Sequence, residues 1–217
     1  MKLKLKSNFW QPWMAAFDSD GQEFRLVTTD GPNRIEQHKI FKKASIPTPL
    51  FGTYNFFLKN QYDPQKKVVV YDDINAHLGE GKRLVVFGEL KDDEKPICLC
   101  EYIDSPISSD QKYVSKSTRL LCVGDYTFQY DYISFDDWRS NNGEGDITES
   151  KMIYTPAWRC KIPYAFFAID MVGPDSNLKA IDFNIAPGIQ SNFPLPATQM
   201  VLSIKSWLQK YANNTEE

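Results

Sequence analysis

The sequence is poor in histidine and cysteine, the residues that build most zinc and redox sites. Of its 217 residues only two are histidines, His38 and His77. The four cysteines are Cys98, Cys100, Cys122 and Cys160. They form no paired CxxC motifs, and neither histidine stands at zinc-site spacing from them, so we expect no zinc site. Cysteines on apolar strands are most often buried free thiols, so the cytoplasm is the expected compartment.

Long apolar runs and a strong net charge are absent as well. No stretch of about 18 apolar residues exists, so we expect no segment that spans a membrane. The opening MKLKLKSNFWQPW carries lysines without an apolar core, so we expect no signal peptide. The net charge of −3 argues against a broad nucleic-acid or membrane surface but leaves room for a local basic pocket. The length fits one generous domain or two small subdomains.

Strand-like and helix-like segments alternate along the chain. Apolar residues at helical spacing predict one helix within 32–49, ended by Pro47 and Pro49, and a C-terminal helix within 196–214. Further strands are expected in 23–29, 66–73, 84–87 and 95–103, and a polar loop in 136–150. The fold class expected from this order is α+β with mostly antiparallel strands.

Two segments have the pattern of β-hairpins. The segment 117–134 consists of two β-rich runs with a turn at 124–125. The segment 164–189 has the same pattern, with a turn at 173–175. We therefore expect two antiparallel hairpins in the C-terminal half of the chain.

The second strand of the later hairpin, AIDFNIAPGIQ, ends in polar residues. Alternation along a strand places Asp182 and Asn184 on one face and Ile181, Phe183 and Ile185 on the other, buried face. A carboxylate and an amide at the end of an apolar strand are suitable ligands for Mg²⁺. The plainer interpretation, a solvated strand end followed by a turn, remains open at this point.

The first strand of this hairpin adds a second carboxylate. With the turn at 173–175, Asp170 is expected to lie across from Asp182. Two carboxylates about 4 Å apart repel by about 4 kcal/mol at an effective dielectric near 20. We therefore expect a cation between them, and expect Asp182→Asn to leave the fold as stable or more so.

Several stretches together resemble the ATP-grasp superfamily, in its carboxylate–amine ligase branch. The segments FFAIDMV and LKAIDFNIAPGI are similar to that family's metal-binding hairpin. Other similar stretches are NRIEQHKIFKKASIPTP, ICLCEYI, STRLLCVGD and DDWRSNNGEGD, in the family's order. The resemblance covers about residues 30 to 213. It implies two α+β subdomains, 1–104 and 105–217, with mostly antiparallel sheets that grip a nucleotide between them.

The resemblance also implies roles for residues of the C-terminal half. Asp170, Asp182 and Asn184 would bind Mg²⁺ or Mn²⁺ at the β- and γ-phosphates of ATP, although the family more often has Glu at the position of Asp182. Arg119 would face the γ-phosphate with its planar fork. Asn142, or its neighbour Asn141, would contact phosphate or metal. The plainer alternatives are a surface arginine for Arg119 and an Asn-Asn-Gly turn for the asparagines.

On the nucleotide side, the resemblance implies that Glu101 and the backbone of Tyr102 and Ile103 contact adenine and ribose. The sequence departs from the family at Tyr71, where the strand before the glycine-rich flap usually ends in lysine. Either Lys67 or Lys82 is expected to substitute for that lysine. The GEGK stretch that contains Lys82 is a candidate phosphate loop or an ordinary hairpin turn.

A second departure is the near absence of the family's N-terminal, substrate-side domain, since only about 30 residues precede the first similar helix. The protein is then a minimal version, relies on a protein partner or homodimer, or has lost activity. The leading expectation is an ATP-dependent ligase that joins a small-molecule or peptide carboxylate to an amine through an acyl phosphate. Alternatives are a non-catalytic nucleotide- or peptide-binding module and a small-molecule kinase of the same fold.

Overall fold

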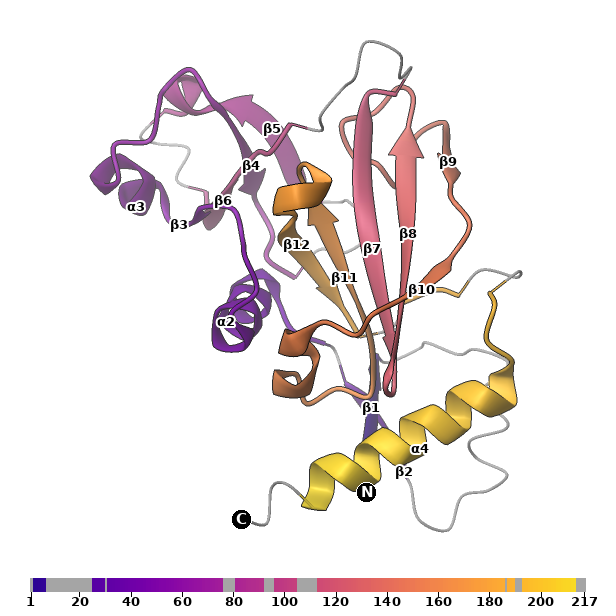
Figure 1. Ribbon diagram of the computed structural model, residues 1–217. Coiled ribbons are helices and arrows are strands. Elements are labelled where there is room, and N and C mark those ends of the chain that lie inside the picture. Colours follow the sequence, from indigo (N-terminus) through magenta and orange to yellow (C-terminus); the bar gives the residue numbers. More distant parts are fainter. Residues whose placement is uncertain are drawn as a thin grey trace.

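A computed structural model describes residues 2–6, 25–29, 31–75, 81–91, 96–104, 113–185, 187–189 and 193–213. Gly79 and Glu80 of the expected phosphate loop lie outside these residues, and so does His77. Within the described part, two antiparallel sheets account for most of the strands, and a short parallel pair stands apart from them. The α+β fold class expected from the sequence is confirmed (Figure 1).

The first sheet is four-stranded, with the order β3-β6-β4-β5. Its strands are β3 (Phe51–Gly52), β4 (Lys67–Tyr71), β5 (Lys82–Val86) and β6 (Cys98–Glu101). One face packs on helix α3 (Tyr54–Lys59), where Phe57 is fully buried against Val68, Val70 and Leu99. The opposite face carries Val69 and Tyr71, since side chains alternate along β4. This second face lines a cavity between the two sheets.

The second sheet is six-stranded, with the path β10-β8-β7-β11-β12 and β9 paired to β8. Its strands are β7 (Ser115–Val123), β8 (Tyr126–Ser134), β9 (Gly145–Ile147), β10 (Lys151–Ile153), β11 (Phe166–Val172) and β12 (Lys179–Asn184). Both expected hairpins are present, as β7–β8 and β11–β12. The turn at Gly124 has a φ of +57°, and a Cβ there would lie 2.2 Å from the carbonyl oxygen of Ser203. Glycine is therefore required at this turn by conformation and by space.

Helices cover both faces of the second sheet. Phe166 and Ala168 of β11 pack toward helix α4 (Ala197–Asn213), whose buried residues include Ile204. Phe167 and Ile169 face the other way, toward helix α2 (Arg34–Ala44). A strand buried on both faces has a continuous apolar sequence, which explains the run FFAI in β11. Figure 1 shows α4 crossing the base of the sheet and α2 lying beside β11 and β12.

Helix α2 has strong local signals at both ends. Asn33 is the N-cap and forms a capping box with Glu36, in which each backbone amide donates to the other residue's side chain. Ser45 closes the helix in the left-handed conformation, with a φ of +61°, two residues before Pro47. The expected first helix is thus confirmed, and so is the expected C-terminal helix, α4.

The remaining elements are small. Strands β1 (Lys2–Lys6) and β2 (Arg25–Thr29) form the parallel pair, and 3₁₀ turns span η1 (Phe87–Glu89), η2 (Ala157–Lys161) and η3 (Asp175–Asn177). Among the helices that the structure describes, none is long and apolar enough to cross a membrane. The two sheets come from either side of residue 104, but α2 packs on the second sheet, so the domain division 1–104 and 105–217 stays a prediction.

Candidate functional site

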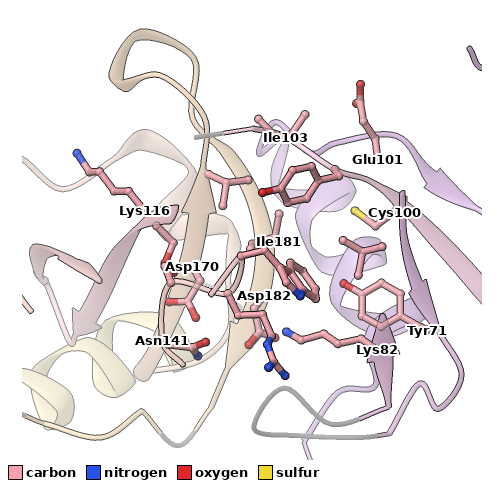
Figure 2. A pocket seen from close by; sticks show the side chains of 17 residues that line it. Tyr71, Lys82, Cys100, Glu101, Ile103, Lys116, Asn141, Asp170, Ile181 and Asp182 are labelled. Carbon is pink, nitrogen blue, oxygen red and sulfur yellow. The ribbon is translucent and has the colours of Figure 1, made fainter. Parts of the chain in front are cut away.

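A cavity of about 740 Å³, including its open mouth, lies between the two sheets. Its wall is formed by the second face of the first sheet, by the segment after β6, by the loop after β8 and by the ends of β11 and β12. The lining residues are Val69, Tyr71, Lys82, Cys100, Glu101, Tyr102, Ile103, Lys116, Ser117, Trp138, Arg139, Ser140, Asn141, Asp170, Val172, Ile181 and Asp182 (Figure 2).

The β11–β12 hairpin places two carboxylates in the cavity. Asp170 and Asp182 are direct partners in the antiparallel ladder, as expected from the sequence. The next pair, however, is Met171 with Ala180, so Ile181 is an extra residue in a β-bulge. Because of the bulge, Ile181 lines the cavity beside Asp182, and the expectation that it lies on the buried face is wrong.

Beyond the bulge the alternation of β12 is as expected. Phe183 and Ile185 are buried in the core under α2. Asn184 pairs with Ala168 in the ladder and is not among the residues that line the cavity. Of the three expected metal ligands, the structure therefore brings Asp170 and Asp182 together at the cavity wall.

Arg119 of β7 holds the first carboxylate. It is the ladder partner of Asp170 on the other side of β11, and both side chains are nearly buried, at 8% and 9% exposure. The guanidinium donates through Nε to Oδ1 at 2.6 Å and through Nη2 to Oδ2 at 2.7 Å. A third bond runs from Nη1 to the Tyr132 hydroxyl at 2.9 Å. Burial disfavours the charged form of Arg119, but Asp170 outweighs this effect and raises its pKa.

Arg34, in the first turn of α2, holds the second carboxylate and was not expected from the sequence. Its Nη1 donates to Oδ1 of Asp182 and, at 3.1 Å, to the side-chain oxygen of Gln37. That oxygen also accepts from the backbone amide of Phe183 at 3.1 Å, which fastens the start of α2 to β12. The guanidinium carbon lies 5.4 Å from the ring centroid of Tyr71. The residue is 6% exposed.

A cation at the start of a helix is the one sequence signal that could have revealed Arg34. The helix dipole favours acidic residues there and disfavours arginine, so a positive residue in the first turn indicates another partner. Burial alone would raise the pKa of Asp182, but the charge of Arg34, followed by that of Lys82, outweighs it and lowers the pKa.

These two ion pairs correct one expectation. The sequence predicts net repulsion between Asp170 and Asp182, and greater or equal stability when Asp182 is neutralised. The structure instead gives each carboxylate an arginine, Arg119 and Arg34. Neutralising either carboxylate would leave a buried arginine without its counterion, which is destabilising. Arg119 is also not the ordinary surface residue that the plainer alternative describes.

Lys82 stands directly across the ladder from Tyr71, at the start of β5. It lines the cavity, and Figure 2 shows its ammonium pointing toward the Asp182 side. Burial, with the nearby charge of Arg34, lowers its pKa. Lys67, the other candidate, is exposed, lies outside the cavity lining and has its ammonium 5.9 Å from the ring centroid of Tyr102.

The segment after β6 forms the less charged end of the cavity. The Glu101 carboxylate accepts from the backbone amide of Leu50 at 3.2 Å and lies 3.6 Å from the ammonium of Lys179. Figure 2 shows it pointing away from Asp170 and Asp182. The backbone amide of Tyr102 already donates to the carbonyl of Lys67 at 3.2 Å. Three expected contacts, Glu101, Tyr102 and Ile103, thus line the cavity, with part of their hydrogen-bonding capacity in use.

The loop after β8 closes one side of the cavity. Trp138 lies edge-on to Tyr102, with 6.1 Å between ring centroids, and Ser140 shares a hydrogen bond with Ser117 of β7. The Asn142 amide donates to Asp137 at 2.6 Å and does not line the cavity, whereas Asn141 does. Of the two expected asparagines, the structure places Asn141 at the site and Asn142 outside it.

No protein-family model matches this sequence, and no curated protein matches it. The search of solved structures gives matches to ligases. The ATP-grasp ligase PsnB, complexed with a minimal precursor, has a TM-score of 0.54 at 10% identity, covering 95% of this chain and 77% of that one. A RiPP-associated ATP-grasp ligase from Chryseobacterium gregarium, in complex with ADP and a leader and core peptide, has a TM-score of 0.53 at 15% identity, covering 90% and 66%.

A third similar structure is the D-alanine–D-alanine ligase from Bacillus anthracis complexed with ATP. Its TM-score is 0.51 at 13% identity, with coverage of 100% of this chain and 97% of that one. This chain has the ATP-grasp fold. The resemblance stated from the sequence motifs is confirmed at the level of the fold. The chain spans about two thirds to three quarters of the first two ATP-grasp ligases.

The ATP-grasp fold implies Mg²⁺, and the described residues allow a test of whether they fit it. Among them, no group of three or more histidine, cysteine or acidic side chains lies together in a way that would hold a metal ion. Asp170 and Asp182 nevertheless face one cavity from opposed ladder positions. Mg²⁺ is commonly held by one or two carboxylates together with substrate phosphates. The donor set therefore fits a Mg²⁺ that arrives with phosphate, and not one held by protein groups alone.

Proposed function

We propose that this chain is an ATP- and Mg²⁺-dependent ligase that joins a carboxylate to an amine. One observation carries the proposal. In a chain with the ATP-grasp fold, the cavity between the two sheets holds the opposed carboxylates Asp170 and Asp182 and, across from them, Lys82. Acidic oxygens and a lysine at one end of a cavity are the groups that bind a metal–phosphate complex.

The two ends of the cavity differ in the way that a nucleotide requires. At one end Val69, Cys100, Tyr102 and Trp138 offer apolar and aromatic surface, which suits an adenine ring. At the other end are the charged groups. We place adenine beside the segment Glu101–Ile103 and the phosphates beside Lys82. In this arrangement Lys82 supplies the positive charge that Tyr71 cannot.

The residues that would hold Mg²⁺ are Asp170 and Asp182, with Asn184 as a further candidate two residues along the strand. When bound, the ion would neutralise the negative charge that the phosphates carry during transfer. Arg119 and Arg34 lie behind those same carboxylates, and Arg139 lines the cavity itself. A bidentate guanidinium matches the geometry of a phosphate as well as that of a carboxylate.

The proposed reaction has two steps. A carboxylate oxygen attacks the γ-phosphorus, the bond to the bridging oxygen breaks, and ADP leaves. The amine then attacks the carbonyl carbon of the acyl phosphate, inorganic phosphate leaves, and the amine proton passes to phosphate or solvent. The chain's contribution is positioning and charge neutralisation. No thiol nucleophile is needed, which agrees with burial raising the pKa of Cys100 to about 12.

The class of carboxylate follows from the similar structures only as a proposal. PsnB, the Chryseobacterium gregarium ligase and the macrocyclase MdnC from Microcystis aeruginosa are each described in complex with a precursor or leader peptide. We propose that this chain likewise acts on a peptide carboxylate.

The proposal is tested first by ligand binding and then by trapping. Mg-ATP at about 100 times its dissociation constant should stabilise the folded chain by roughly 2.7 kcal/mol in a thermal-unfolding assay. With a panel of peptide and small-molecule carboxylates, hydroxylamine in place of the amine should give a hydroxamate and ADP. Absence of any thermal shift at millimolar Mg-ATP counts against the proposal.

A second candidate is a non-catalytic nucleotide- or peptide-binding module. The observation that favours it is Tyr71, which stands buried beside Arg34 where the similar family has a lysine. A module of this kind would bind ATP and release no ADP with any carboxylate and amine. The kinase alternative would release ADP and leave a phosphorylated product that hydroxylamine does not intercept.

A further inference from the structure

The carboxylates of the cavity are already paired with cations. Three carboxylates line it, and each has a positive partner. The pairs are Asp170 with Arg119 at 2.6 Å, Glu101 with Lys179 at 3.6 Å, and Asp182 with Arg34. Two of these partners, Arg119 and Arg34, are buried arginines that have no other carboxylate within ion-pair distance among the described residues. A metal ion that enters alone would meet two carboxylates whose charges these arginines already neutralise.

The cations that line the cavity are not all paired. Lys116 lies 3.0 Å from Asp131, and Arg139 lies 2.8 Å from Asp137. Lys82 is different, because in the part of the chain that the structure describes its ammonium group makes no ion pair and no hydrogen bond. It is nevertheless partly buried and faces the same space as Asp182 (Figure 2). The unmatched charge of the cavity is therefore positive.

The sign of this charge decides which ligand enters first. A partly desolvated cation without a counterion is costly, and a nearby anion relieves that cost. A divalent cation beside Lys82, with its two carboxylates already neutralised, would add repulsion instead. A polyphosphate offers oxygens to Lys82, which lines the cavity, and adds the negative charge that a metal ion beside the neutralised carboxylates needs.

We infer that the empty cavity is an anion site, so that a polyphosphate binds without a divalent cation and the cation enters only with it or after it. The inference deepens the proposed function, and its ATP arm rests on that proposal. It concerns the order in which the polyphosphate and the divalent cation bind beside Asp170 and Asp182. It would make the chain insensitive to free divalent cations until nucleotide is present.

The test measures binding to the full chain by titration calorimetry, with MnCl₂ alone, sodium tripolyphosphate in EDTA, and ATP in EDTA. Mn²⁺ binding is also followed by the electron paramagnetic resonance signal of the free ion. We expect both anions to bind in EDTA, and Mn²⁺ to bind at least 100-fold more weakly alone than with ATP present. Equal Mn²⁺ affinity with and without ATP overturns the inference, as does anion binding that appears only when Mn²⁺ is added.

The remaining outcomes separate the inference from the proposed function. If tripolyphosphate binds in EDTA and ATP does not bind under any condition, the inference stands and the nucleotide proposal falls. If neither anion binds with or without Mn²⁺, both fall. Lys82→Met should weaken tripolyphosphate binding at least tenfold. Lys66 is a solvent-exposed lysine beside the same sheet, and Lys66→Met should leave the affinity unchanged. Equal effects of the two substitutions would also count against the inference.

Discussion

Replacing Asp170 by asparagine gives a change in stability whose sign distinguishes two accounts of the site. If the two carboxylates mainly repel each other, removal of one charge relieves up to about 4 kcal/mol and the folded state gains stability. If Asp170 mainly serves as the counterion of Arg119, the same change leaves a buried guanidinium without its counterion. The structure supports the second account, because Arg119 donates two bonds of 2.6 and 2.7 Å to this carboxylate.

The magnitude follows from the burial of the pair. Both side chains are less than one tenth exposed, and breaking such a buried pair costs about 3–5 kcal/mol. Asparagine keeps one oxygen that can accept from Arg119, so we expect a loss near the lower end, about 3 kcal/mol. For a chain of this size that corresponds to a fall in Tm of about 6–12 °C.

The assay is urea unfolding of Asp170→Asn at neutral pH, followed by tryptophan fluorescence and circular dichroism, without metal or nucleotide. The midpoint should fall while the slope m stays unchanged, since the exposed surface does not change. Asp175→Asn is the matched control, because its carboxylate is 83% exposed and lies 3.6 Å from Lys116. It should cost no more than about 1 kcal/mol. Equal or greater stability of Asp170→Asn would refute the pairing account.

Three further predictions concern single side chains. Lys82→Met should weaken Mg-ATP binding at least tenfold in calorimetry, whereas Lys67→Met should not; the reverse result would assign the phosphate lysine to β4. His38, stacked on Phe51 at 3.6 Å, has its pKa lowered to about 4 by burial. Its neutral form is favoured in the folded state, so stability should be lost as pH falls from 6.5 toward 4, by at most about 3 kcal/mol. His38→Phe should reduce the pH dependence of the urea midpoint between pH 6.5 and pH 4. An unchanged pH dependence would show that His38 is not its source. Arg119→Lys should lower stability by about 1–3 kcal/mol, because an ammonium cannot reproduce the two-bond fork; an unchanged urea midpoint would show that the fork contributes nothing.

The opposed carboxylates were predictable because a hairpin is a local structure. The turn at 173–175 and the two apolar strands place Asp170 across from Asp182, with no information needed from the rest of the chain. The bulge at Ile181 was not predictable in this way. Strict alternation assigns Ile181 to the buried face, and only the packing of Ala180 under α2 shows that one residue is inserted.

The arginine partners illustrate the limit for distant contacts. Arg34 and Asp182 are 148 positions apart, and their contact depends on how α2 packs on β12. Arg119 could be placed on a strand beside the hairpin. The sequence could not show that its guanidinium would hydrogen-bond to Asp170. A local inconsistency, the arginine in the first turn of α2, is the only hint of such a contact.

Short elements escaped prediction for a different reason. Strand β3 has two residues and α3 has six, which is too short for a periodic pattern to emerge. Strands β9 and β10 each have three residues and lie within or next to the segment expected to be a polar loop. The pairing partner on β8, and not their own sequence, makes them strands.

The central claim, transfer of the γ-phosphoryl group of ATP to a carboxylate, is tested most directly by isotope transfer. The chain is incubated with Mg-ATP, an amine and a panel of carboxylates labelled with ¹⁸O, and the released phosphate is examined by ³¹P NMR. The account predicts ADP together with inorganic phosphate that carries one ¹⁸O from the carboxylate. Release of AMP and pyrophosphate, or of phosphate without label while an amide forms, would contradict it.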